Sequence, residues 1–326
     1  MTNPTITILM ATYNGSKFFA AQIDSIIAQS YTNWELLIRD DGSSDDTVNL
    51  ILAAVKNDDR IKIITNPSKQ PGACANFSSL LSWAKANREL DYIMFCDQDD
   101  IWLPGKITYS LHQLQQTEMA NQGKPCLVYG HLNMMDENGE PMKEIISMLA
   151  PPHFNNIIVQ NPMFGCTMMF NKALAQLLPE IPPNAENHDY WVALVAVALG
   201  VYTIIPEDII LYRQHTNNVT SQGAGLLKRF NRYYNNEKQI KELAKKLVML
   251  CNFFEMYHLQ LRAKDKNLLN DFLSSFKSPL PGTLISVLIT HKICKVTKSQ
   301  TMAMLYVMIK NYFIVRKAIL NINFLK

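Results

Sequence analysis

Three carboxylates fall within four positions directly after an apolar run. Residues 92–96 are rich in aromatic and branched side chains and predict a buried strand, which Asp97, Asp99 and Asp100 follow at once. Clustered carboxylate oxygens suit a hard divalent cation such as Mg²⁺ or Mn²⁺, which in proteins commonly binds the phosphates of a substrate. The alternative is a solvated acidic turn after a core strand, because Asp-rich turns are common on surfaces.

A further carboxylate, Asp189, stands about 90 residues later at the start of an apolar helix over 192–199. Capping of the helix is a sufficient explanation at this point, because an Asp in the first turn accepts hydrogen bonds from free backbone N–H groups.

The elements around these acids alternate between strands and helices from the first residues onward. β-branched and aromatic runs predict strands, and apolar residues at helical spacing between them predict helices. This order indicates an α/β protein with a doubly wound, mostly parallel sheet. The expected strands are residues 5–10, 35–39, 61–65, 92–96, 126–130 and 201–205. The segment 136–152, with three prolines, predicts an irregular excursion.

In a sheet of this kind ligands bind beyond the carboxyl ends of the strands. Residues 12–14, Asp40 and Asp41, and residues 97–100 each follow a predicted strand directly, so we expect them to meet at one crevice. The chain has neither G-x-G-x-x-G nor G-x-x-x-x-G-K-[ST]. Phosphates in this crevice would therefore need a metal ion and side chains in place of a glycine-rich cradle.

The charge is divided unevenly along the 326 residues. Residues 1–225 hold 13 basic and 23 acidic residues, whereas residues 226–326 hold 18 basic and 5 acidic residues. We therefore expect two units, 1–222 and 226–326, of which the second faces an anionic partner. The six scattered cysteines and the absence of a charged-then-apolar leader favour a reducing, cytoplasmic location.

Helical spacing dominates after residue 226, and one predicted helix face carries eight mostly apolar residues. No apolar run reaches the length of about 18 residues that spans a bilayer. A basic amphipathic region lying in the plane of an anionic membrane fits this pattern. A helical cap over the core, with its lysines in water, is the alternative. The face consists of Ile240, Leu243, Ala244, Leu247, Cys251, Phe254, His258 and Leu261.

Five short motifs occur in an order that resembles family 2 glycosyltransferases of the GT-A fold. The resemblance covers about residues 4–222. Within the family, the motifs most resemble those of bacterial rhamnosyltransferases that build cell-wall rhamnan or capsular polysaccharide. It implies a nucleotide-sugar-binding, Rossmann-like mixed sheet flanked by helices, followed by a C-terminal helical region. The motifs are TYNG at 12–15, RDDGSSD at 39–45, DQDDIWLP at 97–104, HDYW at 188–191 and LYRQH at 211–215.

The resemblance also implies a role for each matching residue. The nucleotide sugar would be bound by Thr12, Tyr13, Asn14, Asp41, Asn76 and Asp97, with Asp41 on the pyrimidine base and Asp97 near the ribose. Asp99, at the D-x-D position, would hold Mg²⁺ or Mn²⁺ on the diphosphate together with His215. Asp189 would be the general base of an inverting transfer. The acceptor and sugar wall would comprise Trp102, His188, Tyr190, Trp191 and Arg213.

The resemblance leaves the substrates open. The leading expectation is dTDP-rhamnose as donor and a lipid-linked or growing saccharide as acceptor, at the inner face of the plasma membrane. The alternatives are a UDP-hexose or UDP-GlcNAc donor, or a non-catalytic nucleotide-binding scaffold of a polysaccharide assembly complex. No nucleic-acid partner is expected. The Gln-x-x-Arg-Trp motif of processive members is absent, which favours single additions.

Overall fold

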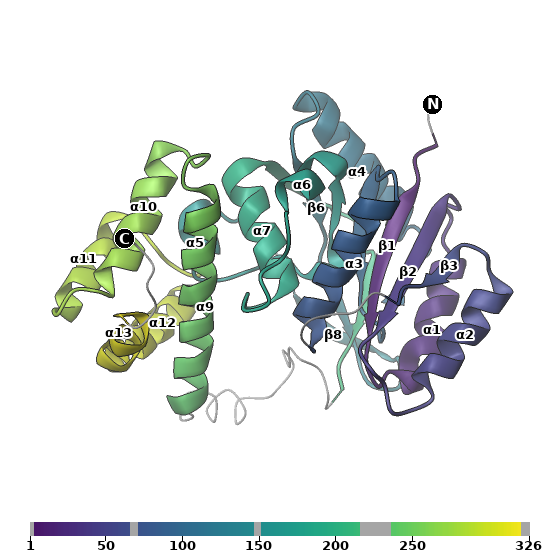
Figure 1. The fold of residues 1–326 in the computed structure, drawn as a ribbon, viewed down its shortest axis with the longest axis horizontal. Coiled ribbons are helices and arrows are strands. Elements are labelled where there is room, and N and C mark those ends of the chain that lie inside the picture. The colour runs from purple at the N-terminus through teal and green to yellow at the C-terminus, as the bar shows by residue number, and fades with distance from the viewer. Residues whose placement is uncertain (1–2, 66–70, 147–150, 216–235, 321–326) are drawn as a thin grey trace.

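The computed structural model describes residues 3–65, 71–146, 151–215 and 236–320, and these form two sheets surrounded by helices (Figure 1). The larger sheet has seven strands, and β9 is antiparallel to both of its neighbours. The prediction of a mixed, mostly parallel α/β sheet is therefore confirmed. The strand order is β10 (Val201–Ile204), β6 (Cys126–Tyr129), β9 (Met169–Asn171), β4 (Tyr92–Cys96), β1 (Ile6–Thr12), β2 (Trp34–Asp40) and β3 (Ile61–Ile63).

Alternate residues of the interior strand β1 face two separate apolar cores. Leu9 packs with the core that includes α3 (Ala73–Asn87) and α7 (His188–Leu199). Ile8 and Met10 pack with the core formed by the helices of the other face, α1 (Ser16–Ile27), α2 (Thr47–Asn57) and α4 (Lys106–Ala120). Because successive strand side chains point to opposite faces, one apolar run supplies both layers.

A second, four-stranded sheet was not predicted. Its order is β5 (Ile101–Trp102), β11 (Ile210–Arg213), β7 (Leu132–Met135) and β8 (Pro141–Ile146). The irregular excursion expected at 136–152 is wrong for β8, which pairs antiparallel with β7 through a turn containing Gly139 at φ +93°. The prolines misled the prediction because Pro141 begins an edge strand, where no ladder N–H is required. This sheet connects the loop after β4 to the motif at 211–215.

The C-terminal helices are α9 (Asn236–Tyr257), α10 (Ala263–Ser275), α11 (Pro281–Thr290), α12 (Lys298–Lys310) and α13 (Tyr312–Leu320). They share one apolar core with α7 and the short helix α5 (Phe154–Ile157). The boundary expected between 222 and 226 lies outside the described residues.

The α9 face singled out in the sequence contacts protein. Leu243, Leu247 and Phe254 are buried, and Phe253 and Tyr257 pack around the Trp191 ring. This face is therefore covered by protein and not by a membrane, and the core-cap alternative holds for α9. No helix in the described ranges is long and apolar enough to cross a bilayer.

Candidate active site

The ends of β1, β2 and β4 place three loops at the same edge of the sheet. Thr12 is in register with Asp40, and Met10 is in register with Cys96. Asn14 joins the first two loops, because its backbone N–H donates to Ser43 Oγ at 2.8 Å and its Oδ1 accepts from Ser44 N at 2.8 Å. Its φ of +47° suits Asn, which tolerates the left-handed region better than most residues.

The two carboxylates of the loop after β2 have different partners: Asp40 accepts hydrogen bonds from Thr12 and from its own loop, and Asp41 accepts one from the start of α3. The Thr12 hydroxyl is buried and donates to Asp40 Oδ1 at 2.9 Å, so Thr12 positions this loop. The prediction that the Thr12 side chain binds the nucleotide sugar does not agree with this position. Asp41 Oδ2 accepts from Gly72 N at 2.6 Å, which fixes the carboxylate beside the start of α3.

Asn76 was predicted to contact the nucleotide sugar, but the structure gives it another role. It is buried, and its Nδ2 donates to Arg39 O at 2.9 Å. The amide thus holds the end of β2 in place through this hydrogen bond.

Gln98 is a site residue that sequence reasoning missed. Its Oε1 accepts from Tyr13 N at 2.9 Å and its Nε2 donates to Tyr13 O at 3.0 Å, so the loops after β1 and β4 are joined by a reciprocal pair. A Cβ on Gly15 would lie 2.2 Å from Gln98 Oε1. The signal available in the sequence was the middle position of D-x-D, whose partner 85 residues away only the fold reveals.

Asp99 and His215 meet as predicted. His215 Nε2 lies 2.7 Å from Asp99 Oδ2, and both side chains are partly exposed. Arg213, predicted to form part of the acceptor wall, is buried: its Nε donates to Asp99 O at 2.8 Å and its backbone N–H to Asp100 Oδ1 at 3.1 Å. Arg213 therefore positions the acidic loop, and the wall assignment is wrong for it.

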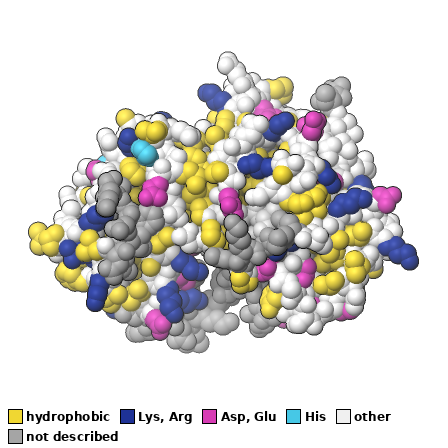
Figure 2. All heavy atoms as spheres, in the orientation of Figure 1, with side chains coloured by type: hydrophobic (Ala, Val, Ile, Leu, Met, Phe, Trp, Pro, Cys, Tyr) yellow, Lys and Arg dark blue, Asp and Glu magenta, His cyan; other side chains and the backbone are white. Residues whose placement is uncertain are grey.

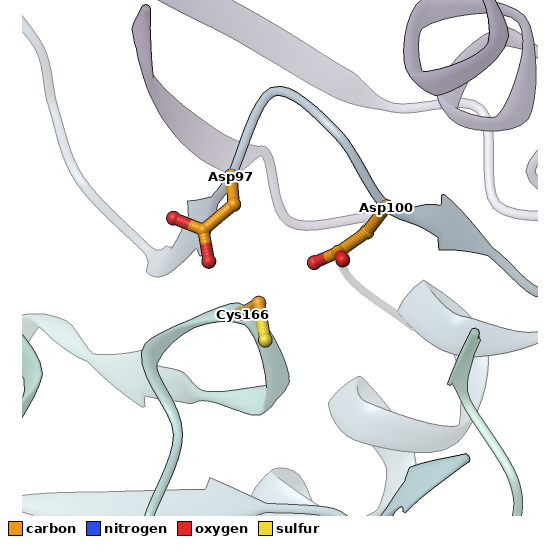
Figure 3. Close-up of side chains that lie close together, drawn as sticks. All are labelled: Asp97, Asp100 and Cys166. Atoms are coloured by element: carbon orange, nitrogen blue, oxygen red, sulfur yellow. The ribbon is translucent and has the colours of Figure 1, made fainter. Parts of the chain in front are cut away.

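Asp97 and Asp100 converge with the Cys166 thiol, whose 3₁₀ turn η1 (Gly165–Thr167) lies against β4 (Figure 3). Their ligand atoms all lie within 4.8 Å of one another. Burial raises the pKa of Asp97 to about 7, and the charges of Asp99 and Asp189 raise it further. The pKa of Asp100 is also raised by burial and by Asp99.

Lys106, another residue that sequence reasoning missed, is completely buried beside this cluster. Its Nζ donates to Cys166 O and lies 4.3 Å from the centre of the Trp102 ring. Burial lowers its pKa to about 8, while the acids around it oppose that shift. Lys106 thus supplies a fixed positive charge to Asp97 and Asp100.

The two acidic groupings differ in how well they suit a divalent cation. The Cys166 sulfur is a soft ligand, whereas Mg²⁺ and Mn²⁺ prefer oxygen ligands, and the buried Lys106 already lies beside the adjacent acids. Asp99 and His215 offer a carboxylate oxygen and an imidazole nitrogen in partly exposed positions. This donor set fits Mn²⁺ well, whereas Mg²⁺ would rely on the carboxylate.

Asp189 lies in the first turn of α7, and its carboxylate is held from outside the helix. Its Oδ2 accepts from Gly165 N at 3.1 Å, while its Oδ1 is buried and has no partner within the described residues. Burial raises the pKa of Asp189 to about 6, although hydrogen bonds from Gly165 and Tyr190 lower it. Its charge acts on Asp97, so the two acids share one environment. Capping alone does not explain this arrangement.

The predicted aromatic wall is wrong. Trp102 and Trp191 are at most 2% exposed, and Tyr190 donates its hydroxyl proton to Ile157 O at 2.6 Å inside the core. The His188 ring stacks on Phe77 with centroids 3.8 Å apart, and burial lowers its pKa to about 3, which keeps it neutral. Aromatic spacing could not distinguish these core positions from a ligand surface.

Gly165→Ala should lower the activity of this site about a hundredfold, because a Cβ there would lie 2.9 Å from His188 Nε2 and 3.1 Å from Asp189 Cβ. Misplacing a reacting group by about 1 Å costs this much. The control is Gly282→Ala, whose Cβ would meet nothing within 4 Å. Rates for the purified variants measure the effect, and equal rates would show that the site tolerates the shift.

Solved structures share this fold. TarS 1-349 from S. aureus, in complex with UDP-GlcNAc, superposes with a TM-score of 0.56 at 14% identity, covering 97% of this chain and 92% of that one. A Pyrobaculum calidifontis mannosyltransferase in complex with GDP-Man and Mn²⁺ gives 0.52 at 13% identity, covering 98% and 87%. These likenesses show the GT-A fold.

Residues 7–178 match the family described as Glycosyl transferase family 2, and the chain belongs to this family of glycosyltransferases. It is 30% identical over 191 residues, 58% of this chain and 68% of the relative, to the UDP-Glc:alpha-D-GlcNAc-diphosphoundecaprenol beta-1,3-glucosyltransferase WfgD of Escherichia coli. An uncharacterized glycosyltransferase of Rickettsia typhi is 23% identical over 83% of this chain and 88% of its own length. Several other curated relatives are matched over only about a third of their length.

Proposed function

We propose that this glycosyltransferase moves a sugar from a nucleotide diphosphate donor onto a lipid-linked saccharide, with inversion at the sugar carbon C1. The observation that carries the proposal is the unpartnered Oδ1 of Asp189, in a carboxyl group with a pKa near 6 that shares its environment with Asp97. A buried carboxylate that is ionised at neutral pH and has a free oxygen is equipped to accept a proton.

The proposed step needs one base and no separate acid. The acceptor oxygen attacks C1 from the face opposite the diphosphate, its proton passes to Asp189 Oδ1, and the bond between C1 and the diphosphate oxygen breaks. Gly165 keeps the other carboxylate oxygen occupied and so orients the base. The diphosphate leaves without protonation when a cation balances its charge.

The donor would lie along the three loops at the sheet edge. The half-exposed Tyr13 and Asn14 would face the nucleotide, Asp41 would accept from the pyrimidine N3–H, and Asp97 would lie near the ribose. Asp99 and His215 would hold Mn²⁺ or Mg²⁺, which supplies charge neutralisation at the diphosphate. These roles would divide the chain into a transferase unit over 1–222 and a helical region over 226–326.

The sugar is proposed as L-rhamnose from dTDP-rhamnose, on the motif resemblance. A UDP-sugar donor is the second candidate, since WfgD is named for UDP-Glc and TarS was solved with UDP-GlcNAc. The lipid-linked acceptor follows the diphosphoundecaprenol in the WfgD name. With such an acceptor, the proposed location of the enzyme is peripheral, at the inner face of the plasma membrane.

A panel of dTDP-rhamnose, UDP-Glc, UDP-Gal and UDP-GlcNAc, assayed with a diphosphoundecaprenol-linked saccharide, tests this proposal. Release of one nucleoside diphosphate together with a lengthened lipid product supports it and selects the donor. Absence of product with every donor, at donor concentrations that saturate binding, would contradict it.

Asp99→Ala should weaken donor binding in Mn²⁺ by about 10- to 100-fold, the range expected for one lost charge-assisted contact. Calorimetry with and without a chelator measures this loss. The control is Asp59→Ala, an exposed carboxylate beside β3. Wild-type binding that is unchanged in chelator would remove the metal from the proposal.

A further inference from the structure

Exposed apolar side chains are concentrated at the C-terminal end of the described chain. Ten of the 18 large hydrophobic residues that are exposed fall between positions 280 and 320. Ile289, Met302 and Phe313 are each more than 60% exposed. We define the α11–α13 face by its exposed residues Ile285, Ile289, Met302, Tyr306, Ile309 and Phe313.

Each of these helices already buries another apolar edge. Leu288 of α11, Met308 of α12 and Val315 of α13 are buried in the core shared with α9. Surface helices of soluble proteins place charged and polar groups opposite the buried stripe. Here α11 contains no charged residue at all, and α12 contains none between Lys298 and Lys310. The exposed apolar residues of the α11–α13 face are therefore not needed to pack these helices onto the core.

Most of the charges around the face are positive. The exception is Asp271 of α10, whose carboxylate lies 2.8 Å from His291 Nε2 at the end of α11. Residues 272–326 contain eight Lys and Arg and no Asp or Glu. Lys292, Lys298, Lys310 and Lys317 are exposed, and Lys310 Nζ lies 5.6 Å from the Tyr306 ring centre. In Figure 2 hydrophobic and basic side chains lie next to one another at the end of the molecule that holds these helices. Such a mixture suits an anionic lipid interface, which takes up apolar groups and attracts lysines.

We propose that the α11–α13 face docks the protein onto an anionic bilayer. A second copy of the chain is a poorer occupant, because a two-fold interface would bring two predominantly basic surfaces together. The buried face of α9 takes no part. The face lies at the opposite end of the molecule from β3 and α2 (Figure 1), and its assignment does not depend on the donor or acceptor proposed above.

Sedimentation of the full chain with vesicles tests this assignment. Vesicles of 30% phosphatidylglycerol in phosphatidylcholine should bind the protein, and vesicles of phosphatidylcholine alone should bind it more weakly. The double variant Ile289→Glu/Phe313→Glu should lower the partition coefficient at least tenfold, because it removes two inserted apolar groups and adds two negative charges. The matched control is Leu52→Glu/Met119→Glu, two exposed apolar residues of α2 and α4, and should bind as the wild type does.

Charge is tested separately with Lys310→Gln and Lys317→Gln, each of which should lower binding about fivefold on anionic vesicles only. The controls are Lys56→Gln and Lys62→Gln, which are exposed near β3.

No binding by the wild type, or equal binding by Ile289→Glu/Phe313→Glu, would overturn the proposal. Sedimentation equilibrium identifies the alternative: a dimer that the same double variant dissociates would assign the face to a second copy. The vesicle assay reads no sugar transfer, so its failure and a failure of the proposed activity are distinguishable.

Discussion

Asp189→Asn is expected to lower the turnover number by about a thousandfold, within the range that general-base catalysis contributes. The amide is nearly isosteric, and its oxygen can still accept from Gly165 N, so the start of α7 should keep its structure. Binding of the donor should be unchanged, since in the proposed site Asp189 contacts the acceptor and not the nucleotide. Turnover with saturating donor and acceptor, together with calorimetry of donor binding, measures the two parts.

The same variant has a signature in the pH profile. The base works only when ionised, and its pKa is raised to about 6, so kcat/KM should rise with pH up to about 6 and then level off. The residual activity of Asp189→Asn should lack that rise. Glu180→Gln removes an exposed carboxylate of the preceding loop and should change neither the rate nor the profile. Turnover of Asp189→Asn close to the wild-type value would exclude Asp189 as the base.

Lys106→Met is expected to lower the free energy of unfolding by about 3 kcal/mol, the scale of breaking a buried ion pair from one side. Methionine fills a similar volume but leaves Asp97 and Asp100 without their buried positive charge. It also removes the hydrogen bond to Cys166 O, next to the Gly165 that orients Asp189. Urea unfolding measures the loss, and Lys56→Met, at an exposed site on α2, should shift stability by less than about 0.5 kcal/mol.

A second variant separates charge from shape at this position. If Lys106 acts by balancing the acids, then adding Asp100→Asn to Lys106→Met should restore part of the lost stability, because one unbalanced carboxylate is removed. A double variant with the sum of the two single losses would show that the charges do not interact. In that case Lys106 would matter only for its contacts with Trp102 and Cys166.

Local patterns in the sequence were enough to predict which strand ends and loops form the site. Strand runs followed by turn residues placed Asn14, Asp41 and Asp97 at strand ends, and parallel pairing obliges such ends to meet at one edge. The meeting of Asp99 with His215, 116 positions apart, was expected only from the order of motifs and is present in the fold. Periodicity also identified α9, since its 3.6-residue repeat is strong.

The same patterns could not say what each face contacts. From the sequence, Trp102, Trp191 and the apolar face of α9 could equally form a ligand or membrane surface or belong to the core, and the structure buries all three in the core. An amphipathic repeat records that one side of a helix avoids water, whereas the group that covers it depends on distant parts of the chain.

The residue types and their order along the chain specified an α/β glycosyltransferase frame with an acidic edge. The three-dimensional arrangement assigned the partners: Gln98 to Tyr13, Lys106 to Cys166, and Gly165 to Asp189. It also left the outer faces of α11, α12 and α13 uncovered. These contacts join residues 24 to 85 positions apart, and no local propensity or short-range pattern carries information about pairs at that separation.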